Sequence, residues 1–296
     1  MDIGIIFPQT EIETGKDAII KFAKTAENLG FSHIFMADHV LGANPAVHEH
    51  VRDHYYTHDS IINEVFVTLG FISAITEKIG LMTGILILPQ RSAALVAKQS
   101  AEIAVLSNDR FRLGIGVGWN HVEFEALGMD FENRGPFVTE QIQLIRELWS
   151  KDIVDFHGQW HDVSQAGLNP RPNKKIPLWL GAGSSFSPKP PTVVLQRVAE
   201  YADGWCPNFE PDDQGREIVD TVTRMMEANH RDPSTLLLEG RIRTSGKTPD
   251  EIKKEIEQWR ELGASHIGIE NRRAGIKGIQ SHLEAMNDFV TQVGFS

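Results

Sequence analysis

Strand-like and helix-like segments alternate eight times along this chain of 296 residues. Regular alternation of this kind is typical of parallel βα units. The strand-like segments are residues 3–7, 33–37, 80–86, 112–117, 177–181, 204–206, 236–241 and 266–270. The helix-like segments are residues 16–29, 62–76, 93–106, 137–149, 193–201, 216–229, 249–262 and 276–293. Eight repeats predict one (β/α)8 barrel domain over residues 1–296, and a doubly wound open sheet is the alternative.

Two stretches are longer than a minimal barrel needs, and we expect both to be insertions. Residues 41–63 follow the second strand-like segment and are rich in His, Asn and Tyr. Residues 152–175 follow the fourth helix-like segment and run into the proline-rich sequence NPRPNKKIP. The active sites of such barrels lie at the C-terminal ends of the strands. The first insertion is therefore predicted to act as a lid.

Composition narrows the class of protein. A formal net charge of −11 argues against nucleic acid or anionic membrane surfaces as partners. The single cysteine, Cys206, permits no internal disulfide, which is typical of the reducing cytoplasm. No segment has the length and apolar character of a membrane span. We expect a cytoplasmic protein that acts on a small molecule.

The sequence FRLGIGVGWNHVE, residues 111–123, contains a strand with one bare face. Gly114, Gly116 and Gly118 recur every second residue and therefore project to the same side. A strand without side chains on one face indicates close approach to its backbone, and a flat ligand would suit that face. These glycines lie within the strand, so they are not the dinucleotide fingerprint, which needs its glycines in the turn after a strand.

Polar or small residues follow several predicted strands and are candidates for a site. His39 follows the second strand, where an imidazole can donate a hydrogen bond or transfer a proton near neutral pH; a hydrogen-bonded histidine beside Asp38 is the alternative. The small residues 181–185 follow the fifth strand and favour a phosphate site over a simple turn. Gly84 interrupts the third strand, which indicates a bulge or a close contact.

The predicted lid contains four histidines, and we expect no metal site there. His48, His50, His54 and His58 lack regular helical spacing and a cysteine partner. A metallohydrolase barrel would also need a His-x-His pair at the end of the first strand, where this chain has Phe-Pro-Gln.

Several motifs in the same order resemble the luciferase-like monooxygenase superfamily, most closely its branch that depends on the deazaflavin coenzyme F420. The matching stretches are GIIFPQ (4–9), AENLGFSHIFMADHV (26–40), YTHDS (56–60), LPQRSAALVAKQSAEIAVLSNDRFRLGIGVGWNHVEFEALG (88–128), PLWLGAGS (177–184) and ADGWCP (202–207). The resemblance extends over essentially the whole chain and implies a (β/α)8 barrel with the cofactor ring over its mouth.

The resemblance also implies roles for particular residues. His39 would contact the ring and be the catalytic residue, and Gly84 and Ile85 would form the bulge behind the ring, which in many F420-dependent members contains a non-proline cis peptide. The remaining cofactor-binding positions are Trp119 and Asn120 at the ring edge, and Gly181, Ala182, Gly183 and Ser184 at the cofactor phosphate.

One position departs from the pattern of some relatives. Some F420-dependent sugar-phosphate dehydrogenases carry an acidic glutamate where this chain has Trp119, and an indole cannot supply a proton in the same way. A sugar-phosphate dehydrogenase is therefore disfavoured. His39 and Glu123 are the candidates for proton transfer, although a structural role for Glu123 beside a backbone amide at the barrel rim is the preferred interpretation.

Two enzyme classes remain open after the resemblance. The first is an F420-dependent oxidoreductase that transfers a hydride to or from a small organic substrate; the second is an FMN-dependent monooxygenase that uses oxygen. F420 carries a long anionic tail, so a basic groove formed by Arg134, Lys174, Lys175 and Lys189 would favour it. A non-catalytic flavin-binding protein is a further alternative. Members of the superfamily are often dimers, so we expect a homodimer.

Overall fold

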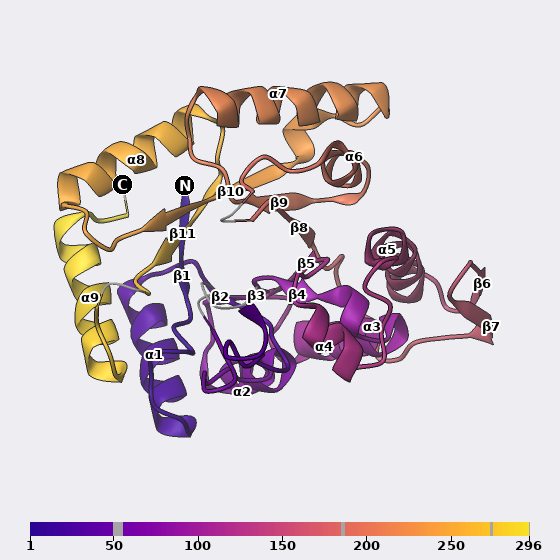
Figure 1. Cartoon of the computed structure of the whole chain (residues 1–296), viewed down its shortest axis with the longest axis horizontal. Coiled ribbons are helices and arrows are strands. Elements are labelled where there is room, and N and C mark those ends of the chain that lie inside the picture. The colour runs from indigo at the N-terminus through magenta and orange to yellow at the C-terminus, as the bar shows by residue number, and fades with distance from the viewer. Residues whose placement is uncertain (50–55, 185–186, 273–274, 296) are drawn as a thin grey trace.

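The computed structural model describes residues 1–49, 56–184, 187–272 and 275–295, and its central strands form a closed parallel barrel (Figure 1). The strand order is β3-β2-β1-β11-β10-β9-β8-β5-β4, and an additional pairing of β3 with β5 closes the ring. The barrel strands are β1 Asp2–Ile6, β2 His33–Met36, β3 Gly80–Thr83, β4 Leu86–Ile87, β5 Phe111–Gly116, β8 Leu178–Ala182, β9 Gly204–Pro207, β10 Leu237–Arg243 and β11 His266–Glu270. Both β3 and β4 pair with β5, so these two strands occupy one of eight positions around the ring. The predicted (β/α)8 barrel is therefore confirmed and the open sheet is excluded.

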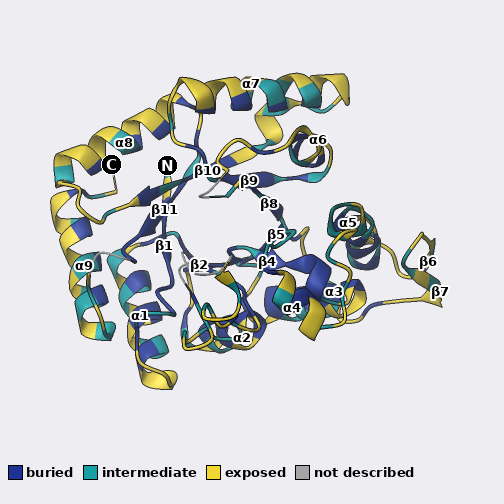
Figure 2. Cartoon of the chain, viewed as in Figure 1, coloured by how far each residue is buried: buried dark blue, intermediate teal, exposed yellow. Residues whose placement is uncertain are grey.

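Helices surround the barrel and turn their apolar sides toward it. They are α1 Lys16–Leu29, α2 Val65–Ile75, α3 Ala93–Leu106, α4 His121–Ala126, α5 Arg134–Ser150, α6 Thr192–Tyr201, α7 Asp213–Ala228, α8 Pro249–Glu261 and α9 Ile279–Gln292, with the short 3-10 turns Leu88–Gln90 and Pro233–Thr235. Figure 2 shows buried strands and helices that are buried on the inner side and exposed on the outer side. Among the described helices, none combines the length and apolar composition needed to cross a bilayer.

The helix ends follow local sequence signals. Thr248 and Glu251 form a reciprocal capping box at the start of α8, with Pro249 at its first position. Gly30 ends α1 in the left-handed conformation, with φ of 90°. These signals explain why the end of α1 and the start of α8 agree with the sequence-based ranges.

Three elements differ from expectation. The predicted strand 80–86 is split into β3 and β4 by a bulge at Gly84 and Ile85. The second insertion contains an antiparallel hairpin of β6 Val154–His157 and β7 Asp162–Ala166, which lies beyond α5, away from the barrel (Figure 1). Helix α4 follows the glycine-rich strand and was not predicted.

Two apolar clusters make up the core. The larger one lies between the strands and the surrounding helices. The smaller one lies within the barrel and is formed by Ile6, Phe35, Met82, Trp179 and Cys206, with Ile85 packed against it. Since neighbouring residues of a strand alternate between the two sides, β2 contributes Ile34 to the outer cluster and Phe35 to the inner one. The inner cluster is therefore the floor beneath the barrel mouth.

Candidate active site

A cavity of about 590 Å³ opens at the C-terminal ends of the strands. This volume is in the range of small-molecule and cofactor sites, and this end of the barrel is where such enzymes place their chemistry. Its lining includes His39, Gly84, Ile85, Trp119, Gly181, Gly183 and Ser184 from the residues expected at the site. The structure thus brings seven of the nine expected positions together around one cavity.

The two other expected positions lie in the packed structure beside the cavity. Asn120 is fully buried and caps α4 by accepting a hydrogen bond from the amide of Val122 at 3.2 Å. Ala182 is 1% exposed and packs into the outer core. Both positions have local structural roles, so a direct contact with a cofactor stays a prediction for them.

The bulge at Gly84 and Ile85 forms one wall of the cavity. The peptide bond between these residues is cis, as the resemblance predicted. A Cβ atom on Gly84 would lie 2.1 Å from the ring of Phe35, so only glycine fits here. The amide of Gly84 donates to the carbonyl of Met36 at 2.6 Å, which fastens the bulge to β2.

The bare glycine face of β5 accommodates this bulge, which is the close approach to the strand backbone that the glycines predict. A Cβ atom on Gly114 would lie 2.1 Å from the carbonyl oxygen of Thr83. A Cβ atom on Gly116 would lie 3.0 Å from a methyl carbon of Ile85, and one on Gly118 would lie 2.5 Å from Ile87. The missing side chains let the chain between β3 and β4 approach β5 closely. The glycines support the cavity wall chiefly through the bulge.

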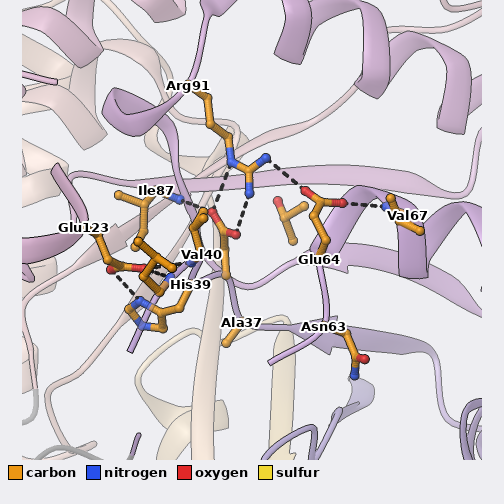
Figure 3. Close-up of polar contacts among 12 residues, drawn as sticks. Ala37, His39, Val40, Asn63, Glu64, Val67, Ile87, Arg91 and Glu123 are labelled. Carbon is orange, nitrogen blue, oxygen red and sulfur yellow. Dashed lines mark hydrogen bonds and ion pairs between the residues drawn. The ribbon is translucent and has the colours of Figure 1, made fainter. Parts of the chain in front are cut away.

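An ion-pair network holds the far end of the bulge. Asp38 accepts a hydrogen bond from the amide of Ile87 at 3.0 Å, and the guanidinium of Arg91 binds the same carboxylate at 2.7 Å. Arg91 also contacts Glu64 at 2.9 Å (Figure 3). Because Asp38 is 2% exposed, its charge needs this partner. Asp38, the residue before His39, therefore fixes the position of β4.

His39 and Glu123 form a buried hydrogen-bonded pair at the cavity (Figure 3). Nδ1 of His39 donates to Oε2 of Glu123 at 3.0 Å, while Oε1 accepts from the amides of Val40 and Leu41 at 2.7 and 3.1 Å. Burial raises the pKa of Glu123, but the bonds from His39 and from the two amides outweigh it, so the pKa is lowered. The preferred interpretation of Glu123 as a partner of rim amides agrees with this geometry, and the carboxylate also orients the imidazole.

Aromatic rings enclose this pair on the lid side. The ring of Tyr56 stacks on His39 with centroids 3.9 Å apart, and its hydroxyl donates to Glu123 at 3.2 Å. The side-chain amide of Asn120 donates to the same hydroxyl at 3.0 Å. Trp119 meets the edges of Tyr56 and His39 at centroid distances of 5.7 and 6.1 Å. The first insertion therefore reaches the site through Tyr56, a residue that the sequence analysis did not single out.

The expected phosphate loop is a tight turn at the end of β8. The amide of Ser184 donates to the carbonyl of Ser187 at 3.0 Å, and the amide of Ser187 donates to the Ser184 hydroxyl at 3.0 Å. Both amides are thus engaged within the turn rather than aimed at the cavity. The groups here that suit an anion are the hydroxyls of Ser184 and Ser187 and the guanidinium of Arg197, which lines the cavity from α6.

Two of the four cations expected in a basic groove lie at the other end of the barrel. Lys175 precedes β8 and pairs with Asp203, which precedes β9. Lys174 lies 3.8 Å from Asp109, which precedes β5. Parallel strands begin at the end of the barrel opposite the cavity, so these lysines cannot form a basic groove that leads away from residues 181–184. Arg134 starts α5 and stacks on Phe131, and Lys189 lies in the segment before α6.

The lid histidines are only partly described. His50 and His54 lie outside the described residues. The ring of His48 lies 6.2 Å from that of His121, and His58 lies 3.4 Å from the carboxylate of Asp59 at the surface. Within the described ranges, no three His, Cys, Asp or Glu side chains gather as a metal would require.

A charged wall formed by β10, β11 and Arg272, which follows β11, was not predicted from the sequence. Arg241, Arg243, Glu270 and Arg272 all line the cavity. The signal was present, because Glu239, Arg241 and Arg243 alternate along one strand and therefore point to the same side. In a barrel, charges at this spacing indicate a polar interior along that strand.

Beneath this wall lies a buried titratable cluster. Nε2 of His33 donates to Glu239 at 2.9 Å, and His266 lies opposite Glu239 in the strand register. Burial raises the pKa of Glu239, but His33 and nearby Arg112 outweigh it and lower the pKa to about 2. Burial and Arg112 lower the pKa of His266 to about 4. Glu239 is thus ionised and His266 neutral at physiological pH.

Comparison with known proteins gives a family match over most of the chain. Residues 1–276 match the family model described as luciferase-like monooxygenase. An uncharacterized protein of Mycobacterium tuberculosis is 30% identical over 257 residues, which cover 84% of each chain. The F420-dependent glucose-6-phosphate dehydrogenase of Amycolatopsis mediterranei is 28% identical over 195 residues, covering 64% of this chain and 53% of that protein.

A solved structure supports the fold. An F420-dependent secondary alcohol dehydrogenase in complex with an F420-acetone adduct superimposes with a TM-score of 0.78, covering 99% of this chain and 98% of that one. The sequence identity is 17%, so this likeness bears on the barrel alone.

Proposed function

Because this chain belongs to the luciferase-like monooxygenase family, we propose that it is an F420-dependent oxidoreductase that acts on a small organic substrate. The observation that carries the proposal is the cavity at the strand ends, with the bulge on one side and the His39–Glu123 pair beside it. Its volume of about 590 Å³ is sufficient for a tricyclic ring and a small substrate. The deazaflavin would accept or donate a hydride, which is chemistry that amino-acid side chains lack.

The residues around the cavity fit such a ring. Ile85 presents an apolar side chain from the bulge, and the bulge is held in place by Gly84 against Phe35 and by Asp38 at the amide of Ile87. A flat, rigid surface of this kind supports one face of an aromatic ring. Arg197, with the hydroxyls of Ser184 and Ser187 in the same lining, would hold the cofactor phosphate.

His39 would act in proton transfer. Its Nδ1 donates to the ionised Glu123, so proton exchange with the substrate falls to Nε2. Glu123 is a positioning residue in this scheme, because it touches His39 and the rim amides rather than the cavity contents. Tyr56 covers the imidazole and limits its contact with water.

The FMN-dependent monooxygenase is the second candidate, and one relative favours it. The pyrimidine monooxygenase of Allorhizobium ampelinum is 28% identical over 193 residues, covering 62% of this chain and 50% of that protein. Arg197 lines the cavity, and it donates to the carbonyl of Gly135, the residue after Arg134, so two cations gather here and favour the cofactor with the more anionic tail, which is F420.

The test is a separate titration of the purified protein with F420 and with FMN, followed by absorbance and fluorescence. We expect saturable binding of F420 and weaker binding of FMN. His39→Ala should weaken binding or abolish turnover, while His157→Ala on the exposed β6–β7 hairpin should change neither. Tight FMN binding without F420 binding would establish the second candidate, and binding of neither would overturn the assignment.

A further inference from the structure

The charged wall of β10 and β11 is not used by the proposed cofactor contacts. In the closed strand order, β10 lies halfway around the barrel from the position shared by β3 and β4. The arginines on β10 therefore face the bulge across the cavity. A ring supported by the bulge would leave this opposite side for the substrate.

Strand register brings the wall residues together. Arg241 pairs with Gly268, and Arg243 pairs with Glu270, so the inward side chains of the two strands are neighbours. Gly268 has no side chain, and a Cβ atom there would lie 3.0 Å from Oε1 of Glu239, so the glycine leaves room for that carboxylate beneath the arginines. The guanidinium of Arg241 lies over the ring of Phe35, 5.3 Å from its centroid, at the floor of the cavity.

Two guanidinium groups contact one carboxylate in this wall, and a third acts on it through its charge. Glu270 is 5% exposed and lies 2.6 Å from Nη2 of Arg272 and 3.5 Å from Nε of Arg243. Burial raises the pKa of Glu270, but Arg272, Arg241 and Arg243 together outweigh it and lower the pKa. The wall therefore keeps an excess of positive charge.

The other described residues of the lining do not balance this charge. Among the described residues, the cavity is lined by four arginines, counting Arg197, and by two carboxylates, Asp38 and Glu270. Asp38 is already paired with Arg91. A positive cavity in a chain with a net charge of −11 is a local feature that attracts anions.

We propose that Arg241, Arg243 and Arg272 form an anion subsite for the substrate, which is an organic anion bearing a carboxylate or a phosphate group. Guanidinium groups bind both through paired N–H donors, and Arg243 and Arg272 stand on either side of Glu270 in a suitable arrangement. The assignment to a substrate rests on the proposed function, because it needs the cofactor to occupy the bulge side of the cavity. The anion site itself does not.

The test compares an organic dianion with a neutral analogue of the same size and with a smaller inorganic anion. Succinate, its neutral diamide and inorganic phosphate are added at constant ionic strength to the wild type, Arg241→Gln and Arg224→Gln. Arg224 lies on α7, where it contacts Thr221 at the surface, so this variant loses the same charge elsewhere. Arg243→Gln, at a side chain that is 48% exposed, is a second variant in case Arg241→Gln does not fold.

We expect succinate or phosphate at tens of millimolar to raise the melting temperature of the wild type and Arg224→Gln by about 2 °C. The diamide should have no effect, and the arginine-wall variants should lose most of the rise. The better of the two anions then identifies the substrate group. Equal shifts with succinate and its diamide, or an unchanged response in both wall variants, would overturn the anion subsite.

The same titrations are repeated with saturating F420. Persistence of the anion effect supports a substrate site, whereas its loss would show that the arginines hold the cofactor and would overturn the substrate assignment. If neither F420 nor FMN binds, the proposed function fails, while the anion measurements on the protein alone still decide whether the arginines bind anions.

Discussion

Replacing Glu123 by glutamine tests the hydrogen-bond network at the centre of the site. The carboxylate accepts four hydrogen bonds: two from the amides of Val40 and Leu41 at Oε1, and two from His39 and Tyr56 at Oε2. A side-chain amide has the same shape, but one of its ends is a donor. Whichever way the amide turns, its NH2 group therefore meets two donors.

The two orientations differ in cost, and this difference predicts the outcome. Backbone amides cannot reverse their role, so an NH2 group facing Val40 and Leu41 would leave two partly buried donors unsatisfied, at up to about 1–3 kcal/mol each. His39 and Tyr56 adapt, because the imidazole can move its proton to Nε2 and the hydroxyl can rotate. The NH2 group should face them, and the loss of the charge-assisted bonds should lower the free energy of unfolding by about 2 kcal/mol.

The variant should also change the tautomer of His39. Nitrogen-15 NMR of the ring nitrogens should show the proton on Nδ1 in the wild type and on Nε2 in Glu123→Gln. Urea unfolding measures stability, and Glu125→Gln, exposed on the same helix, is the matched control with an expected change below about 0.5 kcal/mol. A Glu123→Gln protein as stable as this control, or with its Nδ1 proton retained, would refute the reasoning.

Three further predictions follow from buried contacts. Gly84→Ala places a Cβ atom 2.1 Å from the ring of Phe35 and should lower the melting temperature by several degrees, which scanning calorimetry would detect; an unchanged value would contradict this steric limit. Tyr56→Phe removes one buried hydroxyl with two hydrogen bonds and should cost about 1–2 kcal/mol in urea unfolding, and a neutral effect would count against the observed network. Acidification should destabilise the fold in two steps. In the first, His266 gains a proton below its ordinary pKa of 6.5 in the unfolded chain but only below a pKa of about 4 in the folded chain. In the second, Glu239 gains a proton below its ordinary pKa of 4.5 in the unfolded chain but only below a pKa of about 2 in the folded chain. Each step is worth up to about 3 kcal/mol, and a urea midpoint that stays constant from pH 7 to 4.5 would exclude the first step.

The barrel was predictable because its signal is local and repeated. The last strand, residues 266–270, and helices 16–29 and 93–106 have the bounds expected from the sequence. The missed helix α4 carried a signal too, since Asn120 precedes Glu123 by three residues and caps the helix. The β6–β7 hairpin is too polar to be recognised as a pair of strands.

Features that depend on distant residues were not predictable. The apolar run 80–86 reads as one strand, and its break at Gly84 depends on the ring of Phe35 from the neighbouring strand. The partner of His39 lies 84 residues away, so only the assembled barrel pairs it with Glu123. The lysines before β8 show the reverse problem, because proximity in sequence to residues 181–184 placed them at the wrong end of the strand.

The closure of the barrel joins the first strand to the last. The register from Asp2 with His266 to Ile5 with Ile269 is formed by strands from opposite ends of the fold. During synthesis on the ribosome, β1 has β2 as a neighbour early, but its other edge has no partner until β11 has been made. A nascent chain or fragment that stops before residue 266 therefore carries two open strand edges, which are prone to pair with other chains. Closure of the barrel therefore comes late in translation, and until then the open β1 edge needs protection of the kind that chaperones give.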